Sequence, residues 1–182
     1  MHKKISILII AIAFSIHLQA QQYYTKNGRV SFFSKALLED IKADNNQVLS
    51  VIDLKTGTIQ FSLLNNAFHF PKAKMELDFN DDYIESEKYP RSTFKGTISD
   101  FNKVTVDKDG TYNIEVTGGL SIHGVTKKVT ASGTIIIKDG KVSSSSVFKV
   151  TVSDYNIKIP AVVENKVSNN IEITVSCNYE KK

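Results

Sequence analysis

The sequence contains a single cysteine, Cys177, among its 182 residues. A chain with one cysteine cannot form an internal disulfide bond, so its stability has to come from a packed core. A chain of this length can build such a core. Cys177 lies in the stretch IEITVSCNY, where apolar and polar residues alternate. This pattern indicates a small buried side chain on a strand rather than a reactive thiol.

Charge of one sign is not concentrated in any part of the chain. The 23 Lys and Arg residues outnumber the 19 Asp and Glu residues, which gives a formal net charge of +4. Two of the lysines, Lys3 and Lys4, belong to the first 20 residues, and without that segment the excess is halved. Lysines and acids are interspersed along the remainder. Because nucleic-acid binding needs a clustered basic patch, we expect no nucleic-acid partner.

Signatures of cofactor and metal chemistry are also missing. The sequence has no glycine-rich phosphate loop and no dinucleotide-binding fingerprint. Beyond residue 20 only His69 and His123 remain, and they lie far apart without a local ligand pair. The acidic segment 78–87 could supply a carboxylate pair for acid–base chemistry, but a solvated loop explains its composition better. We therefore predict no metal, no cofactor and no catalytic residue.

The N-terminal segment is typical of a secretory signal. Lys3 and Lys4 precede an apolar run from Ile5 to Phe14, and the small residue Ala20 follows. The run is too short to span a bilayer comfortably, although an uncleaved anchor is the alternative interpretation. We expect residues 1–20 to be a signal peptide cleaved after Ala20, and residues 21–182 to form one domain. The protein is then expected in the periplasm or outside the cell.

Most of the remaining chain alternates apolar and polar residues with a period of two. β-Branched residues are frequent in these stretches, which are 58–63, 112–122, 125–137, 142–152 and 171–179. Turn sequences such as Lys138-Asp139-Gly140 separate them. The pattern predicts an all-β fold of eight antiparallel strands, with a ninth left open. Long strands joined by short hairpins favour a closed barrel, whose interior is filled by side chains or holds one small ligand.

Glycines interrupt the predicted strands where an inward side chain is expected. They are Gly96, Gly118 or Gly119, and Gly133. Glycine inside a strand indicates either a bend of the backbone or space left for something else. The sequence leaves both alternatives open.

The segment 68–83 is the exception to the period-two pattern, because it also fits a helix. Ala73, Met75, Leu77 and Phe79 alternate as in a strand. Met75, Phe79 and Tyr83 also lie on one helical face, and Pro71 can open a helix at its first turn. Periodicity alone does not decide between the two.

The stretch GLSIHGVTKKVT, Gly119–Thr130, places a serine and a histidine between glycines, close to the G-x-S-x-G signature of serine hydrolases. That signature requires a strand, a sharp turn and a helix. After Gly124 the residues are β-branched at alternate positions, so another strand follows, and the second glycine is missing from its required place. A two-residue type I′ hairpin turn at His123-Gly124 explains the stretch better, because both residues tolerate positive φ.

Three motifs are specific in combination. They read DYIESEKYPRSTFKG at 82–96, GLSIHGVTK at 119–127 and VSDYNIKIP at 152–160, and FFSK at 32–35 fits the opening strand. Their order and spacing resemble the YceI-like family of periplasmic polyisoprenoid-binding proteins, over about residues 28–178. The resemblance implies a lipocalin-like barrel with a short helical cap around residues 71–80. One departure is Asp78, since many members carry a histidine in the segment that matches 75–80.

The resemblance implies non-enzymatic binding or transport of an extended apolar lipid, a polyisoprenoid such as a polyprenyl phosphate or a quinone, inside the barrel. Burial of each CH₂ group is worth about 0.8 kcal/mol, so a long isoprenoid gains affinity without specific contacts. The apolar residues predicted to line the site are Phe32, Ile59, Phe61, Phe94, Leu120, Ile122, Phe148 and Val150. An error of one residue in register would exchange them for their neighbours.

Two other functions remain open from the sequence. One is a filled barrel that binds another protein through its loops. The other is a lipid-directed hydrolase or isomerase that would have to use His69, His123 or the acidic segment. A lipid ligand would also bring the protein into transient contact with membranes, and the sequence does not indicate an oligomeric state.

Overall fold

The computed structural model describes residues 22–35, 39–105, 107–160 and 168–182. The predicted signal peptide, residues 1–20, lies outside the described residues. The strands are β1 (Gln22–Ser34), β2 (Ile41–Asp53), β3 (Thr58–Leu64), β4 (Arg91–Ser99), β5 (Gly110–Ile122), β6 (Val125–Lys138), β7 (Lys141–Thr151) and β8 (Asn170–Lys181). The helical elements are η1 (Asn65–Ala67), α1 (Ala73–Asp78), η2 (Phe79–Tyr83), η3 (Phe101–Lys103) and η4 (Val152–Tyr155).

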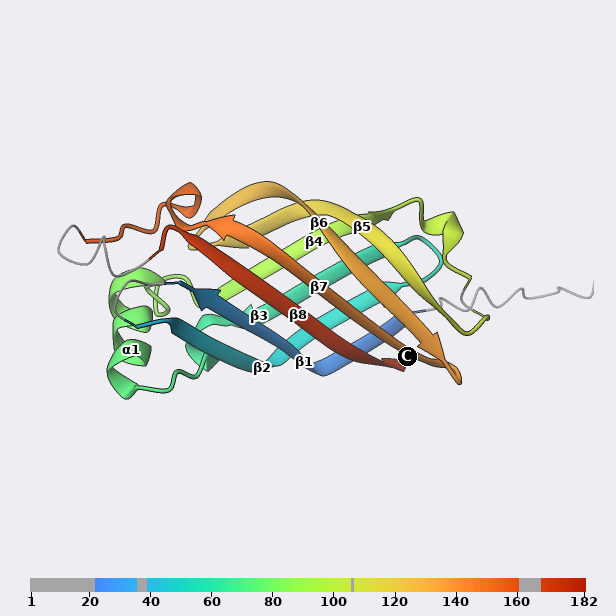
Figure 1. Cartoon of the computed structure of the whole chain (residues 1–182), viewed down its shortest axis with the longest axis horizontal. Helices are drawn as coiled ribbons and strands as arrows, with labels where there is room; N and C mark the ends of the chain where they lie inside the picture. Colours follow the sequence, from blue (N-terminus) through green and yellow to red (C-terminus); the bar gives the residue numbers. More distant parts are fainter. Residues whose placement is uncertain (1–21, 36–38, 106, 161–167) are drawn as a thin grey trace, which may run out of the picture.

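The strands form one closed antiparallel barrel. Each strand pairs with its neighbours in sequence, and β1 pairs with β8 to close the ring. Figure 1 shows the long strands wrapping around a common axis, with α1 at one end and the β6–β7 hairpin at the other. The prediction of an eight-stranded barrel is confirmed, and the described residues contain no ninth strand.

The hairpin turns explain why the strands reverse where they do. His123 and Gly124 both have positive φ, 50° and 73°, and Asp139 and Gly140 repeat this pattern with 50° and 71°. Two consecutive positive values define the type I′ turn, whose twist suits antiparallel strands. The stretch around His123 is therefore a hairpin between β5 and β6, as predicted, and no helix follows it.

The ambiguous segment 68–83 is helical. α1 continues directly into η2, a single turn of π-helix, so the helical cap runs from Ala73 to Tyr83. Phe70 donates its backbone N–H to the Glu76 carboxylate at 3.1 Å, which ties the start of the cap to its first turn. Leu77 is 62% exposed, which a strand with an inward Leu77 would not allow. The helical alternative is thereby confirmed.

Close packing explains two of the glycines inside the strands. Gly96 and Gly118 are cross-strand partners, and a Cβ atom at either would lie 2.6–2.7 Å from the ring of Phe94. A Cβ at Gly133 would lie 2.9 Å from the carbonyl oxygen of Ser145. Protein atoms fill the spaces at Gly96 and Gly118, so close packing accounts for this pair, whereas Gly133 also lines the interior cavity.

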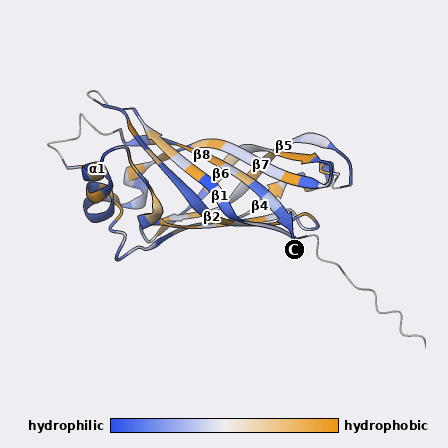
Figure 2. Ribbon diagram, turned by 90° about the horizontal axis from the view of Figure 1, so that it is seen from below, coloured by the Kyte–Doolittle hydropathy of each residue, from blue (hydrophilic) through white to orange (hydrophobic). Residues whose placement is uncertain are grey.

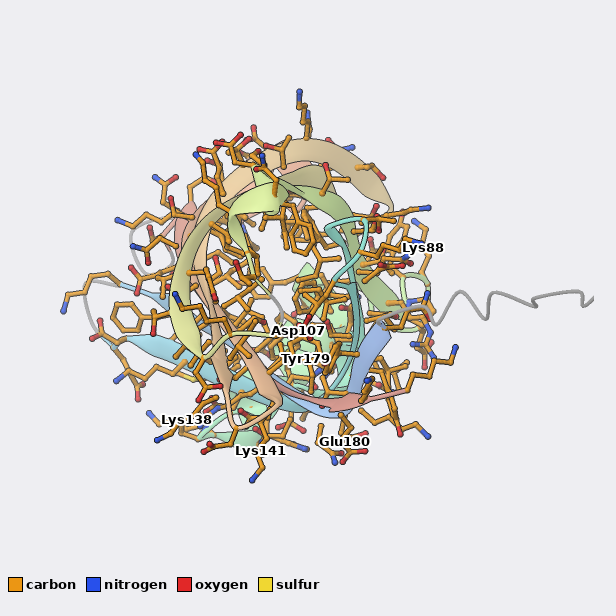
Figure 3. All side chains as sticks on the ribbon, turned by 90° about the vertical axis from the view of Figure 1, so that its right-hand side faces the viewer. Lys88, Asp107, Lys138, Lys141, Tyr179 and Glu180 are labelled. Carbon is orange, nitrogen blue, oxygen red and sulfur yellow. The ribbon has the colours of Figure 1, made fainter. Side chains whose placement is uncertain are left out.

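The interior near the β6–β7 hairpin is packed. Its buried side chains form a continuous apolar cluster of Ile52, Leu54, Ile59, Ile98, Val104, Ile135, Ile137, Val142, Cys177 and Tyr179. Figure 3 looks onto this end of the barrel and shows Tyr179 inside the ring of strands, with Lys138, Lys141 and Glu180 toward its outside. The Tyr179 hydroxyl is hydrogen bonded to Ser50 and Ser144, both at 3.0 Å. Its polar atom is therefore satisfied although it is buried.

His123 connects three segments at the opposite end of the barrel. Its Nε2 lies 2.6 Å from a carboxylate oxygen of Glu85, and its Nδ1 lies 3.1 Å from the carbonyl oxygen of Tyr155. The edge of the ring packs on Tyr89 at a centroid distance of 4.3 Å. A neutral imidazole can donate to only one of these acceptors, whereas the protonated ring donates to both. His123 thus holds the 85–89 loop and η4 against the β5–β6 turn.

Cys177 should be unreactive in the folded protein. It is 1% exposed, and burial raises the pKa of its thiol to about 11. The thiolate, which is the reactive form, is therefore scarce at neutral pH. We expect no labelling by an aromatic disulfide reagent at pH 8 and one labelled thiol per chain after unfolding in urea. Ser176→Cys, which places a thiol on the neighbouring exposed position, is the control and should label in the folded state. Rapid labelling of native Cys177 would contradict the buried placement.

Removing the His123 ring should destabilise the barrel without breaking the turn. His123→Asn keeps a residue that tolerates positive φ, but it loses both ring contacts. We expect a loss of about 1–2 kcal/mol in the free energy of unfolding, as is typical for buried hydrogen bonds. Asp139→Asn makes a similar change in the other type I′ turn and should be nearly neutral. Equal effects of the two substitutions in urea titrations would show that the ring contacts contribute nothing.

The contact with His123 should also make stability depend on pH. The hydrogen bond from His123 lowers the pKa of the Glu85 carboxyl, and the charge of Lys88 acts in the same direction. A carboxyl whose folded pKa is depressed stabilises the fold above its unfolded pKa of about 4.3, and this contribution disappears as the pH falls through the folded value. Glu85→Gln should therefore destabilise the protein at pH 7 and have a smaller effect near pH 3. Urea titrations at both pH values test this, and an effect independent of pH would refute it.

Candidate ligand-binding cavity

The half of the barrel that carries α1 is hollow. A cavity of about 540 Å³ extends from the α1 end down to Ile59, Ile114 and Ser144, where the packed cluster begins. Pockets for small ligands typically measure about 300–1,000 Å³. Figure 2 shows hydrophilic and hydrophobic residues alternating along the strands. This alternation directs polar side chains to solvent and apolar side chains to the barrel interior.

The strands bring most of the predicted lining residues together. Seven of the eight line the cavity: Phe32, Ile59, Phe61, Phe94, Leu120, Ile122 and Phe148. Val150 does not reach the cavity surface, although it lies on the same face of β7 as Phe148. It is 6% exposed and is buried within the apolar cluster that also contains Tyr155 and Ile173. The contribution of these residues to ligand binding stays a prediction.

An aromatic cluster under the helical cap was missed by the sequence interpretation. The rings of Phe68, Phe70 and Phe79 lie 5.4–5.7 Å from the Phe32 ring between centroids, and Phe79 lies 5.6 Å from Phe68 and 5.1 Å from Phe70. The pairs are tilted or edge-on, arrangements that aromatic rings favour. All four rings line the cavity. The helical spacing of Met75, Phe79 and Tyr83 was the available signal for this wall, and the structure places all three on it. The cap is thus a wall of the cavity.

The polar groups on the cavity wall are mostly neutral or acidic. Glu39 and Asp78 lie toward the α1 end, and each is paired with a lysine outside the cavity, Glu39 with Lys72 at 2.6 Å and Asp78 with Lys74 at 2.8 Å. Burial and the charges of Asp78 and Asp82 raise the pKa of Tyr83, which keeps its hydroxyl neutral. Among the described residues that line the cavity there is no lysine, arginine or histidine.

The residues considered for catalysis are not assembled into a catalytic site. The Ser121 hydroxyl is hydrogen bonded to Thr126 at 2.6 Å, whereas His123 contacts Glu85 and Tyr155. The side chain of His69 is 66% exposed and lies 3.7 Å from Glu76. The described part of the chain contains no cluster of His, Cys, Asp or Glu side chains that could hold a metal ion. None of its helices is long and apolar enough to cross a membrane.

Solved structures share this architecture. A polyisoprenoid-binding domain from Saccharophagus degradans, implicated in plant cell wall breakdown, superposes with a TM-score of 0.76 at 13% identity, covering 90% of this chain and 100% of that one. BcnA from Burkholderia cenocepacia superposes with a TM-score of 0.70 at 17% identity, covering 85% of this chain and 96% of that one. At these identities the likeness establishes the fold alone.

Sequence comparison identifies the family. Protein YceI from Escherichia coli O157:H7 and that from Shigella flexneri are each 31% identical over 83 residues, which is 42% of this chain. The match spans 39% of the length of these relatives. The family model of the YceI-like domain matches residues 13–179, nearly the whole sequence. The chain therefore belongs to the YceI-like family.

Proposed function

We propose that this protein binds an extended apolar lipid of the polyisoprenoid class inside its barrel. The observation that carries the proposal is the cavity of about 540 Å³, whose walls are built mainly from aromatic and aliphatic side chains. A filled barrel acting only through its loops would have no use for such a hollow. Family membership and the polyisoprenoid-binding neighbour support the same ligand class.

The chemistry of the wall suits a hydrocarbon chain. Phenylalanine rings and branched aliphatic side chains offer dispersion contacts without demanding hydrogen bonds from the ligand. Each CH₂ group that leaves water for this cavity is worth about 0.8 kcal/mol, so several isoprene units supply useful affinity. A polar ligand would instead need several converging donors and acceptors, and the polar groups of the wall are few and dispersed.

We further propose that the protein acts by binding or transport rather than by catalysis. The Ser121, His123 and His69 side chains all have contacts that serve the fold, and neither histidine lines the cavity. The N-terminal signal-like sequence supports export to the periplasm or beyond, where a barrel could carry a lipid that water would not dissolve.

Lipid carried through native purification tests the proposal. We expect organic extracts of the purified protein to contain an isoprenoid detectable by mass spectrometry, and the emptied protein to take up an apolar fluorophore. Absence of both bound lipid and fluorophore uptake would overturn the proposed function.

A matched pair of variants on β5 ties binding to the cavity. Val116 lines the cavity, whereas its neighbour Glu115 is exposed. Val116→Trp should fill part of the hollow and weaken fluorophore binding at least tenfold, equivalent to about 1.4 kcal/mol. Glu115→Trp adds the same indole to the outer face and should leave binding unchanged. Equal affinities of the two variants would place the bound molecule outside the barrel.

A further inference from the structure

The barrel wall is incomplete between β6 and β7. Their ladder extends only from Lys138↔Lys141 to Gly133↔Ser146. Beyond it, β6 stays paired with β5 as far as Val125, and β7 stays paired with β8 as far as Thr151. Residues 125–132 of β6 and 147–151 of β7 therefore face each other without strand pairing. We call this unpaired stretch the β6–β7 slit, and Figure 1 shows the two strands bowing apart over it.

A similar interruption elsewhere in the barrel is bridged by hydrogen bonds, whereas the slit is bridged only at its two ends. The β2–β3 ladder ends at Leu49↔Ser62, but the chain after β3 closes that place. Asn45 donates its side-chain amide to the carbonyl of Leu64, and Asp44 forms an isolated β-bridge with His69. Among the described residues, hydrogen bonds across the β6–β7 slit lie only at its two ends, and η4 packs against β6 and β7 at the His123 end. The Ser146 hydroxyl donates to the carbonyl of Ser132 at 2.6 Å at one end, and His123 holds Tyr155 at the other.

The cavity extends to both edges of the slit. Val129, Ala131 and Gly133 line it from β6, and Ser146 and Phe148 line it from β7. At the slit, the apolar interior therefore lies close to the outer surface of the barrel.

Lys127 occupies an unusual position at this edge. It pairs across the sheet with Leu120, a cavity-lining residue, and it lies between Val125 and Val129, which pack into the same apolar cluster. Alternation therefore places Lys127 on the inward face of β6. Its side chain is nevertheless exposed. A lysine can keep its ammonium in water while its aliphatic stem follows an apolar surface. Because the edge of β6 is unpaired here, the Lys127 side chain can reach solvent from the inward face of the strand.

Lysines predominate on the two strands that border the slit. The two edges carry Lys127, Lys128 and Lys149. The acids that flank them are Glu172 of β8, the cross-strand partner of Lys149, and Asp154 of η4. The α1 end of the cavity differs, because Glu39 and Asp78 lie on the wall there. An anionic group attached to a buried chain would be attracted to the lysines at the slit, whereas Glu39 and Asp78 at the α1 end are already paired with lysines and give no net attraction.

We propose that the β6–β7 slit is the head-group site of an anionic isoprenoid, with the chain in the cavity and a phosphate beside Lys127. This inference rests on the proposed function, since it requires a chain in the cavity. It adds where the head group of the ligand binds and that this head group is anionic. It also assigns to Lys127 the selectivity for a phosphate over an uncharged head group.

Two probes with the same chain separate the head group from the chain. Farnesyl phosphate and farnesol are titrated by calorimetry into the delipidated protein and its variants. Lys127→Gln should weaken farnesyl phosphate binding about threefold to fivefold, the scale of a partly solvated charge pair, and leave farnesol unchanged. The weakening should diminish at high salt. Lys95→Gln, an exposed lysine on β4 away from the slit, removes the same charge and should affect neither probe.

The possible outcomes distinguish a failure of the head-group site from a failure of the proposed lipid-binding function. In one outcome, farnesol and farnesyl phosphate both bind the wild type, and Lys127→Gln changes neither affinity or changes both equally. This result would overturn the head-group site but leave the proposed lipid-binding function in place. In a second outcome, Asp78→Asn strengthens farnesyl phosphate binding and Lys127→Gln has no effect. This result would overturn the site at the slit and indicate that the head group lies at the α1 end. Wild-type protein that binds neither probe would overturn the proposed function and this inference together.

Discussion

Closure of the sheet between β1 and β8 is the constraint on which the rest of this structure depends. An open sheet of long alternating strands would expose two edges and one apolar face, and closure removes both problems. It also directs alternate side chains of all eight strands into one shared interior, whose width follows from strand number and tilt rather than from side-chain volume. Each level of the barrel must then be filled by side chains or remain hollow.

The two ends of this barrel meet that requirement differently. Near the β6–β7 hairpin, β-branched and aromatic side chains reach one another, and the buried hydroxyl of Tyr179 is hydrogen bonded to two buried serines. Between the two ends, Phe61, Phe94 and Val175 contact both the packed cluster and the cluster around the cavity. Phe94 turns toward the packed end and lies over the Gly96–Gly118 pair, so it thickens the wall instead of crossing the interior. The hollow therefore begins where the side chains no longer span the ring.

The sequence predicted the features that depend on local pattern. Period-two alternation assigned most strands but left open which face of each points inward. With the face chosen here, seven of the eight expected lining residues lie on the cavity wall. Turn chemistry identified the reversal at His123-Gly124, because the requirement for positive φ is local. Features that depend on long-range packing could not be obtained in this way. Examples are the burial of Val150 beneath its neighbours, the aromatic cluster under the cap, and the early end of the β6–β7 ladder.

The family motifs acquire a physical meaning in the contacts of His123. Glu85 and Tyr155 are 38 and 32 residues away from it in the sequence, yet both bond the same imidazole ring. Each of the three motifs supplies one partner, and Tyr89 of the first motif packs against Gly124 of the second. The motifs thus encode a junction that fixes the 85–89 loop, the β5–β6 turn and η4. The serine and histidine in GLSIHG resemble a hydrolase signature, but the serine is hydrogen bonded to Thr126 and the histidine belongs to this junction.

The same junction bears on how a lipid could occupy the barrel. By holding Tyr155 against the β5–β6 turn, His123 bounds one end of the β6–β7 slit, while the Ser146–Ser132 hydrogen bond bounds the other. Between them β6 turns a lysine toward an apolar cavity and still leaves it in contact with water, an arrangement that a continuously paired wall would not permit. A hydrophobic chain needs an interior without charge, and a charged head group needs an opening with charge of the opposite sign. In the proposed head-group site, the slit would meet the second requirement beside the first, so one interruption of the barrel would allow both the burial of the chain and the hydration of its anionic end.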